Sequence, residues 1–345
     1  MARFICQKKC KKSMFKENDI RPKDLLEGQK KAVEADIRTL LDRKSEFVEV
    51  ACPACGGNDF VSKFEKNGFK YVECPKCLTF YMSPRPTLRI LTAFLENSQN
   101  YAYWSKYIFP ASEETRRMKI FSPRVDRVLG LCKKHRVSMD ALLEVGAGFG
   151  TFCEELKGRK IFKRVVAIEP SPTLAAVCRK KGIETVESTI ENIEFKHGKS
   201  FDLVVNFEVI EHLFSPREFV IACRKLLKPS GLFIITCPNG RGFDIKTLGP
   251  VSDTIDHEHL NYFNPESLAV LLTSCGFKVL ESITPGVLDA ELVRNKVIEG
   301  KFDIAGQPFL NEILVEEWDR LGSIFQDFLS FQGLSSNMWL VAKNC

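Results

Sequence analysis

Long hydrophobic runs are missing from this sequence of 345 residues, and so is any strong excess of one charge outside its first residues. The longest apolar runs, such as Leu232–Cys237, fall far short of the roughly 18 residues that a membrane-spanning helix needs. No apolar signal core follows Met1. We therefore expect a soluble, cytoplasmic protein without a membrane span. Its 44% apolar and 27% charged residues are typical of globular proteins, and the length predicts about two domains of roughly 150 residues each.

The net charge of +6 is confined to the N-terminus. Residues 1–23 contain eight Lys or Arg and two acidic residues, which account for the whole excess, so residues 24–345 are neutral overall. A short basic tail is usually solvated, although it can contact phosphate or an anionic surface. The same tail carries Cys6 and Cys10, which we expect to be free thiols. The neutral body argues against nucleic acid as a partner.

The thirteen cysteines are an odd number and follow no export signal, which argues against a disulfide framework. Cys52 and Cys55 are separated by eighteen residues from Cys74 and Cys77, and two CxxC pairs at this spacing are typical of a zinc site. Four thiolates complete a closed, tetrahedral shell around Zn(II). We therefore predict a structural zinc rather than a catalytic one.

Residue patterns divide the chain into four segments. We expect a basic tail and surface helix over 1–49, a zinc ribbon over 50–86 and a helical connector over 87–130. Residues 131–345 form the predicted cofactor domain. Within it, about 285–335 is predicted to be an inserted helical element, because this stretch is too long for a turn between two strands.

From Ala141 onward, short apolar runs alternate with helical stretches, which is typical of a parallel sheet covered by helices. The expected fold class is α/β, with a Rossmann-like sheet behind an N-terminal four-cysteine zinc ribbon. The predicted strands are 141–145, 164–168, 184–187, 203–207, 232–237, 277–283 and 338–342.

The first of these strands runs into a glycine-rich turn that reads EVGAGFG over residues 144–150. Alternate glycines let the backbone turn sharply and approach a ligand, and the helix that follows offers unpaired amides to a nucleotide-type cofactor. The dinucleotide fingerprint would need glycine where this chain has Thr151, so nicotinamide or flavin binding is the weaker interpretation. Glu169 ends the second strand nineteen residues after Gly150, where an acidic group can bind both ribose hydroxyls.

The segments LLEVGAGFGTF, VVAIEPSP, FDLVVNFEVIEHL and LLKPSGLFIITCPN resemble the successive motifs of class I S-adenosylmethionine-dependent methyltransferases. The resemblance covers about residues 141–283 and implies S-adenosylmethionine as cofactor. It implies that Glu144, Gly146 and Gly148 hold the methionine part and that Glu169 binds the ribose. It also implies that Ile190 and Glu191 reach the adenine and that Glu208 borders the methionine end.

Histidine is scarce, with five in the chain, yet His212, His257 and His259 all follow the fourth and fifth strands. An open α/β sheet binds its ligands at these strand ends, and histidine is the usual base near neutral pH. We therefore expect at least one of the three to remove a proton from the acceptor. His135 and His197 are expected to lie away from this edge of the sheet.

Residues 256–263, DHEHLNYF, resemble the His-Glu-His motif of sugar 3-C-methyltransferases, which also carry an N-terminal four-cysteine zinc module. The resemblance implies that His259 is the general base and Glu258 its neighbour at the acceptor, with His212 as the other candidate base. Those enzymes commonly have Tyr where this chain has Asp256. The overall layout also resembles zinc-ribbon methyltransferases of surface-polysaccharide synthesis. The favoured acceptor is thus a small hydroxylated molecule, a sugar or nucleotide-sugar, in carbohydrate biosynthesis.

An aromatic segment precedes the cofactor domain and includes Tyr101, Tyr103, Trp104, Tyr107 and Phe109. Aromatic faces attract a sulfonium cation, so this segment either covers the cofactor or packs in the core. Two other functions stay open at this point. One is an RNA methyltransferase that uses its zinc ribbon for substrate recognition, and the other is a non-catalytic zinc-ribbon binding module.

Overall fold

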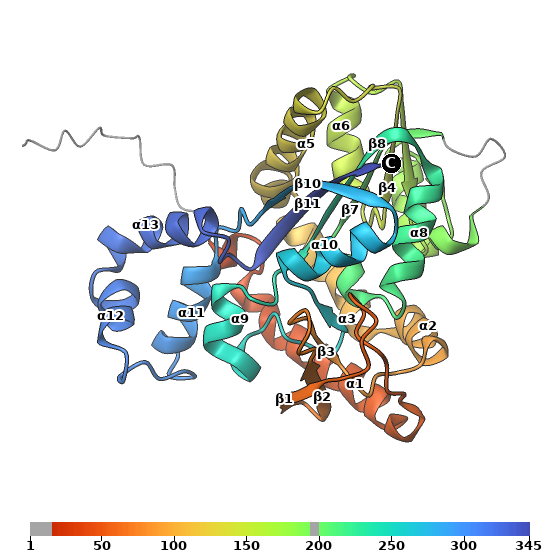
Figure 1. The fold of residues 1–345 in the computed structure, drawn as a ribbon. Helices are drawn as coiled ribbons and strands as arrows, with labels where there is room; N and C mark the ends of the chain where they lie inside the picture. Colours follow the sequence, from red (N-terminus) through yellow and green to blue (C-terminus); the bar gives the residue numbers. More distant parts are fainter. Residues whose placement is uncertain (1–15, 194–199) are drawn as a thin grey trace, which may run out of the picture.

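The computed structural model describes residues 16–193 and 200–345 (Figure 1). Most of the predicted basic tail, the predicted free thiols Cys6 and Cys10, and His197 lie outside the described residues. Within those residues, no helix is long and apolar enough to cross a membrane.

A seven-stranded sheet forms the centre of the described part of the chain (Figure 1). From edge to edge its strands are β10 (Phe277–Ile283), β11 (Asn337–Asn344), β8 (Leu227–Pro238), β7 (Phe201–Phe207), β4 (Ala141–Val145), β5 (Arg164–Ile168) and β6 (Glu184–Val186). β11 runs antiparallel to both of its neighbours, and the pairs from β8 to β6 are parallel. All seven predicted strands are confirmed, although β7, β8 and β11 begin earlier than predicted and β6 ends one residue earlier.

The direction in which successive strands are added reverses between β4 and β7. From β4 the chain continues outward to β5 and β6, and then returns to β7 on the other side of β4. The loops after β4 and β7 therefore leave in opposite directions, and open α/β sheets bind ligands at such a reversal. The glycine-rich turn predicted from the sequence begins at this point.

Helices cover both faces of the sheet because neighbouring strand residues point to opposite sides. On one face, Leu142 packs with Phe152 from the helix after β4, and on the other Leu143 packs with Phe219 from the helix after β7. All four side chains are fully buried or nearly so. The covering helices include α5 (Ser122–Lys134), α6 (Thr151–Gly158), α7 (Pro172–Lys180), α8 (Pro216–Leu226) and α10 (Pro265–Ser274).

A second, smaller sheet joins the cysteine-rich segment to the cofactor domain. Its order is β1 (Val61–Lys66), β2 (Phe69–Glu73), β3 (Phe80–Met82) and β9 (Asn261–Tyr262). β9 directly follows the predicted His-Glu-His motif and pairs antiparallel with β3. Opposite each other in this pair, the rings of Phe80 and Tyr262 stack with centroids 4.2 Å apart. The ribbon and the histidine segment therefore share one aromatic core.

Arg85 fixes the ribbon against two loops of the larger sheet. Its side chain is 1% exposed, and the guanidinium donates to the carbonyl of Met82 (3.0 Å), the carbonyl of Leu260 (3.3 Å) and Asn261 Oδ1 (3.0 Å). Asn261 Nδ2 in turn donates to the carbonyl of Leu213 in the loop after β7 (2.7 Å). This buried cation is costly to remove, because the buried amide oxygen of Asn261 would lose its donor.

The remaining helices frame these two sheets. α1 (Leu26–Leu41) precedes the ribbon, and the connector consists of α2 (Leu88–Asn97), α3 (Gln99–Tyr103) and α4 (Phe109–Arg116), with π-helical turns before and after α4. α9 (Phe243–Leu248) follows β8. The predicted helical insertion is confirmed and contains α11 (Asp289–Ile298), α12 (Pro308–Asn311) and α13 (Trp318–Phe331), which lie together beside α9 in Figure 1.

Candidate active site

The glycine-rich turn after β4 adopts backbone angles that suit glycine. Gly146, Gly148 and Gly150 have φ of 77°, 55° and 69°. A Cβ on Gly146 would lie 2.5 Å from Val209 Cγ2, whereas a Cβ on Gly148 would meet nothing within 4 Å. Gly146 thus allows close packing of the loop after β7, and Gly148 faces open space at the start of α6. This is where the sequence predicts the cofactor.

Glu169 ties this turn to the end of β5. Its side chain is 5% exposed. Oε2 accepts from the amide of Gly148 (2.7 Å) and Oε1 accepts from the amide of Ser171 (2.9 Å). Burial raises the pKa of Glu169, and the two amides act against that shift because they favour the ionised form. A carboxylate held beside the turn can accept hydrogen bonds from ribose hydroxyls.

Glu144 is more deeply enclosed at the end of β4, where it is 3% exposed and accepts from the thiol of Cys153 (2.9 Å). Burial raises the pKa of Glu144 to about 8. The guanidinium of Arg124, from α5, lies 4.4 Å above the ring of Phe207 and interacts electrostatically with Glu208 and Glu144. Sequence reasoning missed Arg124, because nothing in the pattern of α5 separates it from a surface arginine.

Glu208, the first residue after β7, has a φ of 55°, which is uncommon for a residue with a side chain. Its Oε1 accepts from Thr236 Oγ1 (2.5 Å) and Asn337 Nδ2 (3.1 Å). Backbone strain of this kind clusters at functional sites and persists only where neighbours hold it. The sequence indicated Glu208 but not its partners, which come from β8 and β11.

Ile190 and Glu191 form a short 3-10 turn after β6. Ile190 is 3% exposed and packs in the core, while Glu191 is exposed. The two residues predicted to reach the adenine thus face different surroundings. Their role at the cofactor stays a prediction.

His212 and His259 meet beyond the strand ends, with ring centroids 4.6 Å apart. His212 Nδ1 lies 3.1 Å from the carbonyl oxygen of Glu258, and His259 Nδ1 lies 2.8 Å from that of Thr254. A carbonyl only accepts, so each Nδ1 carries a proton, and in the neutral imidazole the lone pair is then on Nε2. Burial lowers the pKa of His212 to about 3.

Asp256 shapes the turn that presents the motif. Its Oδ1 accepts from the amides of Glu258 and His259, both at 2.9 Å. The hydroxyl of Tyr71 donates to the Asp256 carbonyl (2.7 Å), and the Asp256 amide donates to the Tyr262 hydroxyl (3.0 Å). The ribbon tyrosine and the aspartate together hold the backbone of this turn.

Glu258 faces the connector helix α3. Asn100 Nδ2 donates to Glu258 Oε1 (2.6 Å), and Tyr101 interacts electrostatically with the same carboxyl. Burial raises the pKa of Glu258 to about 8. Tyr101, expected over the cofactor or in the core, thus contacts the histidine motif, and Asn100 was missed because it lies on a helix far upstream.

Asp36 of α1 fixes the start of α3. It is 3% exposed and accepts from Ser98 Oγ (2.6 Å), the amide of Gln99 (2.8 Å) and the amide of Asn100 (2.9 Å). These hydrogen bonds cap the helix N-terminus. Asp36 therefore positions Asn100 against Glu258.

His257 lies in a different environment from the other two motif histidines. It is 2% exposed and packs edge-on against Phe94, with ring centroids 5.7 Å apart. Neither ring nitrogen has a hydrogen-bond partner within residues 16–193 and 200–345. His257 groups with Asp36 and Glu258, whereas His135 pairs with Glu281 away from the site.

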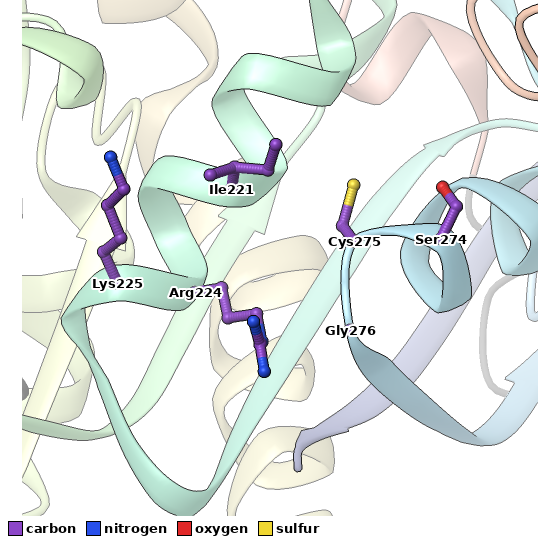
Figure 2. A pocket seen from close by; sticks show the side chains of 6 residues that line it. All are labelled: Ile221, Arg224, Lys225, Ser274, Cys275 and Gly276. Carbon is purple, nitrogen blue, oxygen red and sulfur yellow. The ribbon is translucent and has the colours of Figure 1, made fainter.

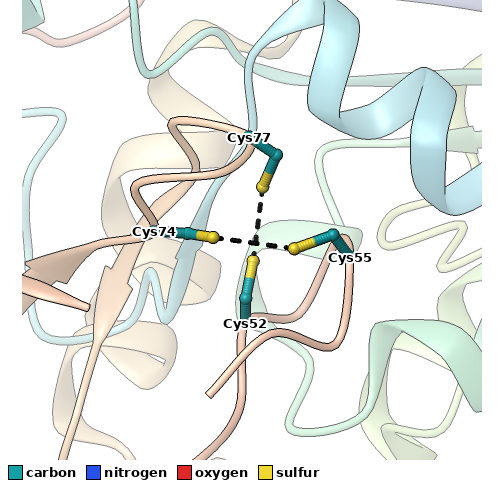
Figure 3. A group of neighbouring side chains, drawn as sticks. All are labelled: Cys52, Cys55, Cys74 and Cys77. Atoms are coloured by element: carbon teal, nitrogen blue, oxygen red, sulfur yellow. Dashed lines mark hydrogen bonds between the residues drawn. The ribbon is translucent and has the colours of Figure 1, made fainter. Parts of the chain in front are cut away.

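The four predicted metal ligands converge in the ribbon, as Figure 3 shows. Sγ of Cys52 lies 3.4 Å from that of Cys77, and Sγ of Cys55 lies 3.6 Å from that of Cys74. A tetrahedron of sulfurs about 2.3 Å from a zinc ion has edges of about 3.8 Å, so the thiol cluster has nearly the required size. The residues present fit a four-thiolate zinc.

A surface pocket lies elsewhere on the cofactor domain (Figure 2). Ile221, Arg224 and Lys225 line it from α8, and the turn from α10 into β10 supplies Ser274, Cys275 and Gly276. α8 and this turn lead into the amino ends of β8 and β10. The pocket therefore lies at the amino ends of these strands, whereas the glycine-rich turn lies at the carboxyl end of β4.

Comparison with known proteins matches residues 112–282 to a family model described as a methyltransferase domain. A probable S-adenosylmethionine-dependent methyltransferase of Mycolicibacterium smegmatis is 28% identical over 159 residues, which are 43% of this chain and 56% of that protein. C-methyltransferase NovU of Streptomyces niveus is 30% identical over 184 residues, 52% of this chain and 42% of NovU. The chain thus spans about half the length of these curated relatives. A solved S-adenosylmethionine-dependent methyltransferase of Archaeoglobus fulgidus aligns with a TM-score of 0.47 at 20% identity, covering 69% of this chain and 100% of that one.

Proposed function

Through residues 112–282 this chain belongs to the class I S-adenosylmethionine-dependent methyltransferases, and we propose that it transfers a methyl group from S-adenosylmethionine to a small hydroxylated acceptor. The acceptor we propose is a sugar or nucleotide-sugar. The observation that carries this proposal is the meeting of His212 and His259 beside Glu258, at the strand ends next to the glycine-rich turn.

On this proposal, the donor lies at the carboxyl ends of β4, β5 and β7. Glu169 binds the ribose hydroxyls. The open space at Gly148 leaves room for the donor to lie against the backbone of the glycine-rich turn. Arg124 pairs with the carboxylate of the amino-acid end, while Glu144 and Glu208 border its ammonium group. When bound, S-adenosylmethionine supplies an electrophilic methyl group on a sulfonium.

The acceptor side supplies the proton chemistry. We assign the general base to His259, because its Nδ1–H is fixed by the Thr254 carbonyl and the opposite nitrogen keeps its lone pair. Glu258, which accepts a hydrogen bond from Asn100, belongs to the same motif and is proposed to bind an acceptor hydroxyl. His212 packs against the base and limits its orientation.

The ribbon is proposed to hold one structural Zn(II) through Cys52, Cys55, Cys74 and Cys77. The convergence of the four sulfurs, all within 4.8 Å of one another, supports this. A closed thiolate shell leaves no position for substrate, so the metal stabilises the sheet that carries β9. Metal analysis is expected to find one zinc per chain bound to the ribbon, and Cys74→Ser is expected to lose it.

The test is a transfer assay with radiolabelled donor and three acceptor pools: nucleotide-sugars, free sugars and bulk RNA. We expect label in a sugar pool, and His259→Ala is expected to lower the rate about 100-fold or more while donor binding persists. Label in RNA alone would contradict the acceptor assignment. Failure of the full chain to bind S-adenosylmethionine in a calorimetric titration would contradict the activity itself.

A further inference from the structure

Glu211 is a buried acid whose surroundings within the chain do not explain it. Its side chain is 0% exposed, and neither carboxyl oxygen has a hydrogen-bond partner among residues 16–193 and 200–345. A second acid, Glu208, interacts with it electrostatically. A buried carboxyl without a partner is costly, and a second acid nearby increases the cost. Something bound from outside the chain would remove this cost.

Two imidazoles with free lone pairs lie next to Glu211. As described above, His212 and His259 each direct Nδ1–H to a backbone carbonyl, that of Glu258 and that of Thr254. Histidines that bind metal ions almost always donate their other ring nitrogen in this way, because the contact fixes the tautomer and the ring orientation. One ligand atom each from Glu211, His212 and His259 lie within 4.8 Å of one another.

We propose that Glu211, His212 and His259 bind a divalent transition-metal ion. Two imidazole nitrogens and one carboxylate oxygen suit zinc, iron(II) or cobalt(II) better than magnesium or calcium, which prefer oxygen ligands. Three protein ligands leave coordination positions open, unlike the ribbon thiolates. The carboxylate neutralises part of the charge of the ion, and the ion satisfies the orphan oxygens of Glu211.

The neighbouring group of Asp36, His257 and Glu258 carries no such proposal. Both oxygens of Asp36 already accept hydrogen bonds from the start of α3, and Oε1 of Glu258 accepts from Asn100. Each of these carboxyls therefore already has a hydrogen-bond donor, whereas both oxygens of Glu211 are without one among the described residues.

The effect of this metal ion on catalysis rests on the proposed function. A histidine whose lone pair coordinates a metal ion cannot take a proton with the same lone pair. If His259 is the base, the metal-loaded chain is the slow form, and added metal inhibits methyl transfer. Regulation by metal would then act directly on the acceptor site.

Cobalt(II) titration of the full-length chain tests the binding site without donor or acceptor. Thiolate-bound cobalt absorbs strongly in the near ultraviolet through sulfur-to-metal charge transfer, whereas cobalt on nitrogen and oxygen ligands does not. We expect one equivalent of cobalt(II) to bind the ribbon cysteines and give the thiolate spectrum. A second equivalent should bind Glu211, His212 and His259 and give only weak visible bands. Glu211→Gln, which keeps the shape of the side chain, is expected to weaken binding of the second equivalent at least about 100-fold and to leave the thiolate signal unchanged.

His212→Gln provides an independent variant, and thermal unfolding shows whether either variant is folded. His135→Gln is the matched control, since His135 pairs with Glu281 away from the site and should keep both equivalents. A single cobalt equivalent in the wild-type chain would overturn the proposal. So would a second equivalent that survives in both Glu211→Gln and His212→Gln, because the ion would then be bound elsewhere.

The transfer assay separates this inference from the function on which its consequence rests. Loss of the second equivalent in the variants together with inhibition of the wild type by cobalt supports both. Cobalt(II) binding to Glu211, His212 and His259 without inhibition of methyl transfer would support the metal site and contradict the assignment of His259 as base. If the wild-type chain binds no second equivalent of cobalt(II) and His259→Ala loses turnover, the metal site is overturned and the assignment of His259 as base stands.

Discussion

Glu144 and Glu169 end adjacent strands and are both buried, yet their neighbours favour different protonation states. Glu169 accepts hydrogen bonds from two backbone amides, which stabilise its ionised form. Glu144 has the weaker thiol donor of Cys153, and burial raises its pKa to about 8. Of the two carboxyls, Glu169 is therefore the better fixed acceptor for hydroxyl groups.

Replacing Glu169 tests its assignment to the ribose. Glu169→Gln keeps the shape but removes the charge, and hydrogen bonds to a charged group contribute about 1.5–3 kcal/mol each. We expect the affinity for S-adenosylmethionine to fall about 10-fold to 100-fold in calorimetric titration. Glu187→Gln, one residue beyond β6, is the control and should bind like the wild type. Equal affinity in all three proteins would refute the ribose assignment.

Glu144 predicts a pH dependence of stability. The unfolded chain releases this proton near pH 4.5 and the folded chain near 8, so the folded state holds an extra proton between these values. The contribution of Glu144 to the free energy of unfolding therefore falls as the pH rises from about 4.5 to 8. Glu144→Gln, which stays neutral, should match the wild type near pH 5 and exceed it at pH 8 by on the order of a few kcal/mol. Urea unfolding without donor measures this difference.

Glu184 supplies a control of opposite sign. Its pKa is lowered by a hydrogen bond from Arg164, and the side chain is half exposed. Glu184→Gln should therefore be slightly less stable than the wild type above pH 5, by less than about 1 kcal/mol. A constant difference between Glu144→Gln and the wild type from pH 5 to 8 would contradict the raised pKa of Glu144.

At the scale of elements, the pairing of β3 with β9 explains why a ribbon precedes this cofactor domain. The pair joins residues that are about 180 positions apart and lies directly after the histidine motif. Arg85 adds hydrogen bonds from the ribbon to both loops that carry the site. The ribbon thus holds the acceptor side, whereas the glycine-rich turn depends on the larger sheet.

Arg85→Met tests this coupling. The methionine fills similar space but leaves the amide oxygen of Asn261 without its donor. We expect a loss of about 3 kcal/mol or more in the free energy of unfolding, measured by urea denaturation. Arg89→Met is the control, because Arg89 is exposed and its ion pair with Glu46 should contribute no more than about 1 kcal/mol. A similar small effect for both variants would show that Arg85 does not couple the elements.

The elements themselves could be predicted from local patterns, but their mutual contacts could not. Apolar runs located β4 and β5 to the residue, because both strands are almost entirely buried. β10 was also located to the residue, although most of it is only partly buried. The cysteine spacing indicated a cluster that the fold then brings together. The β3–β9 pair left no signal, since β9 is only two residues long and its partner lies in a distant segment. Arg124 and Asn100 were missed for the same reason, because their partners are set by tertiary packing.

At the scale of the whole molecule, the acceptor side is assembled from four separate parts of the chain. α1 contributes Asp36, the connector contributes Asn100 and Tyr101, and the loops after β7 and β8 contribute the histidines. The donor side uses the larger sheet and α5. This division predicts that changes in the N-terminal helix affect the reaction rate without affecting donor binding.

Asp36→Asn tests that division from a residue more than 200 positions before the motif. The amide has one acceptor oxygen where the carboxylate uses two, so the start of α3 loses part of its anchor and Asn100 shifts against Glu258. A shift of about 1 Å in a positioning contact can cost up to about 100-fold in rate, so we expect kcat to fall about 10-fold to 100-fold. The dissociation constant for S-adenosylmethionine should stay within about 2-fold of the wild type, because no group that faces the glycine-rich turn changes. Glu34→Gln, on an exposed position of the same helix, should leave both quantities unchanged. Parallel loss of rate and donor affinity in Asp36→Asn would instead mean that α1 supports the whole fold rather than the acceptor side.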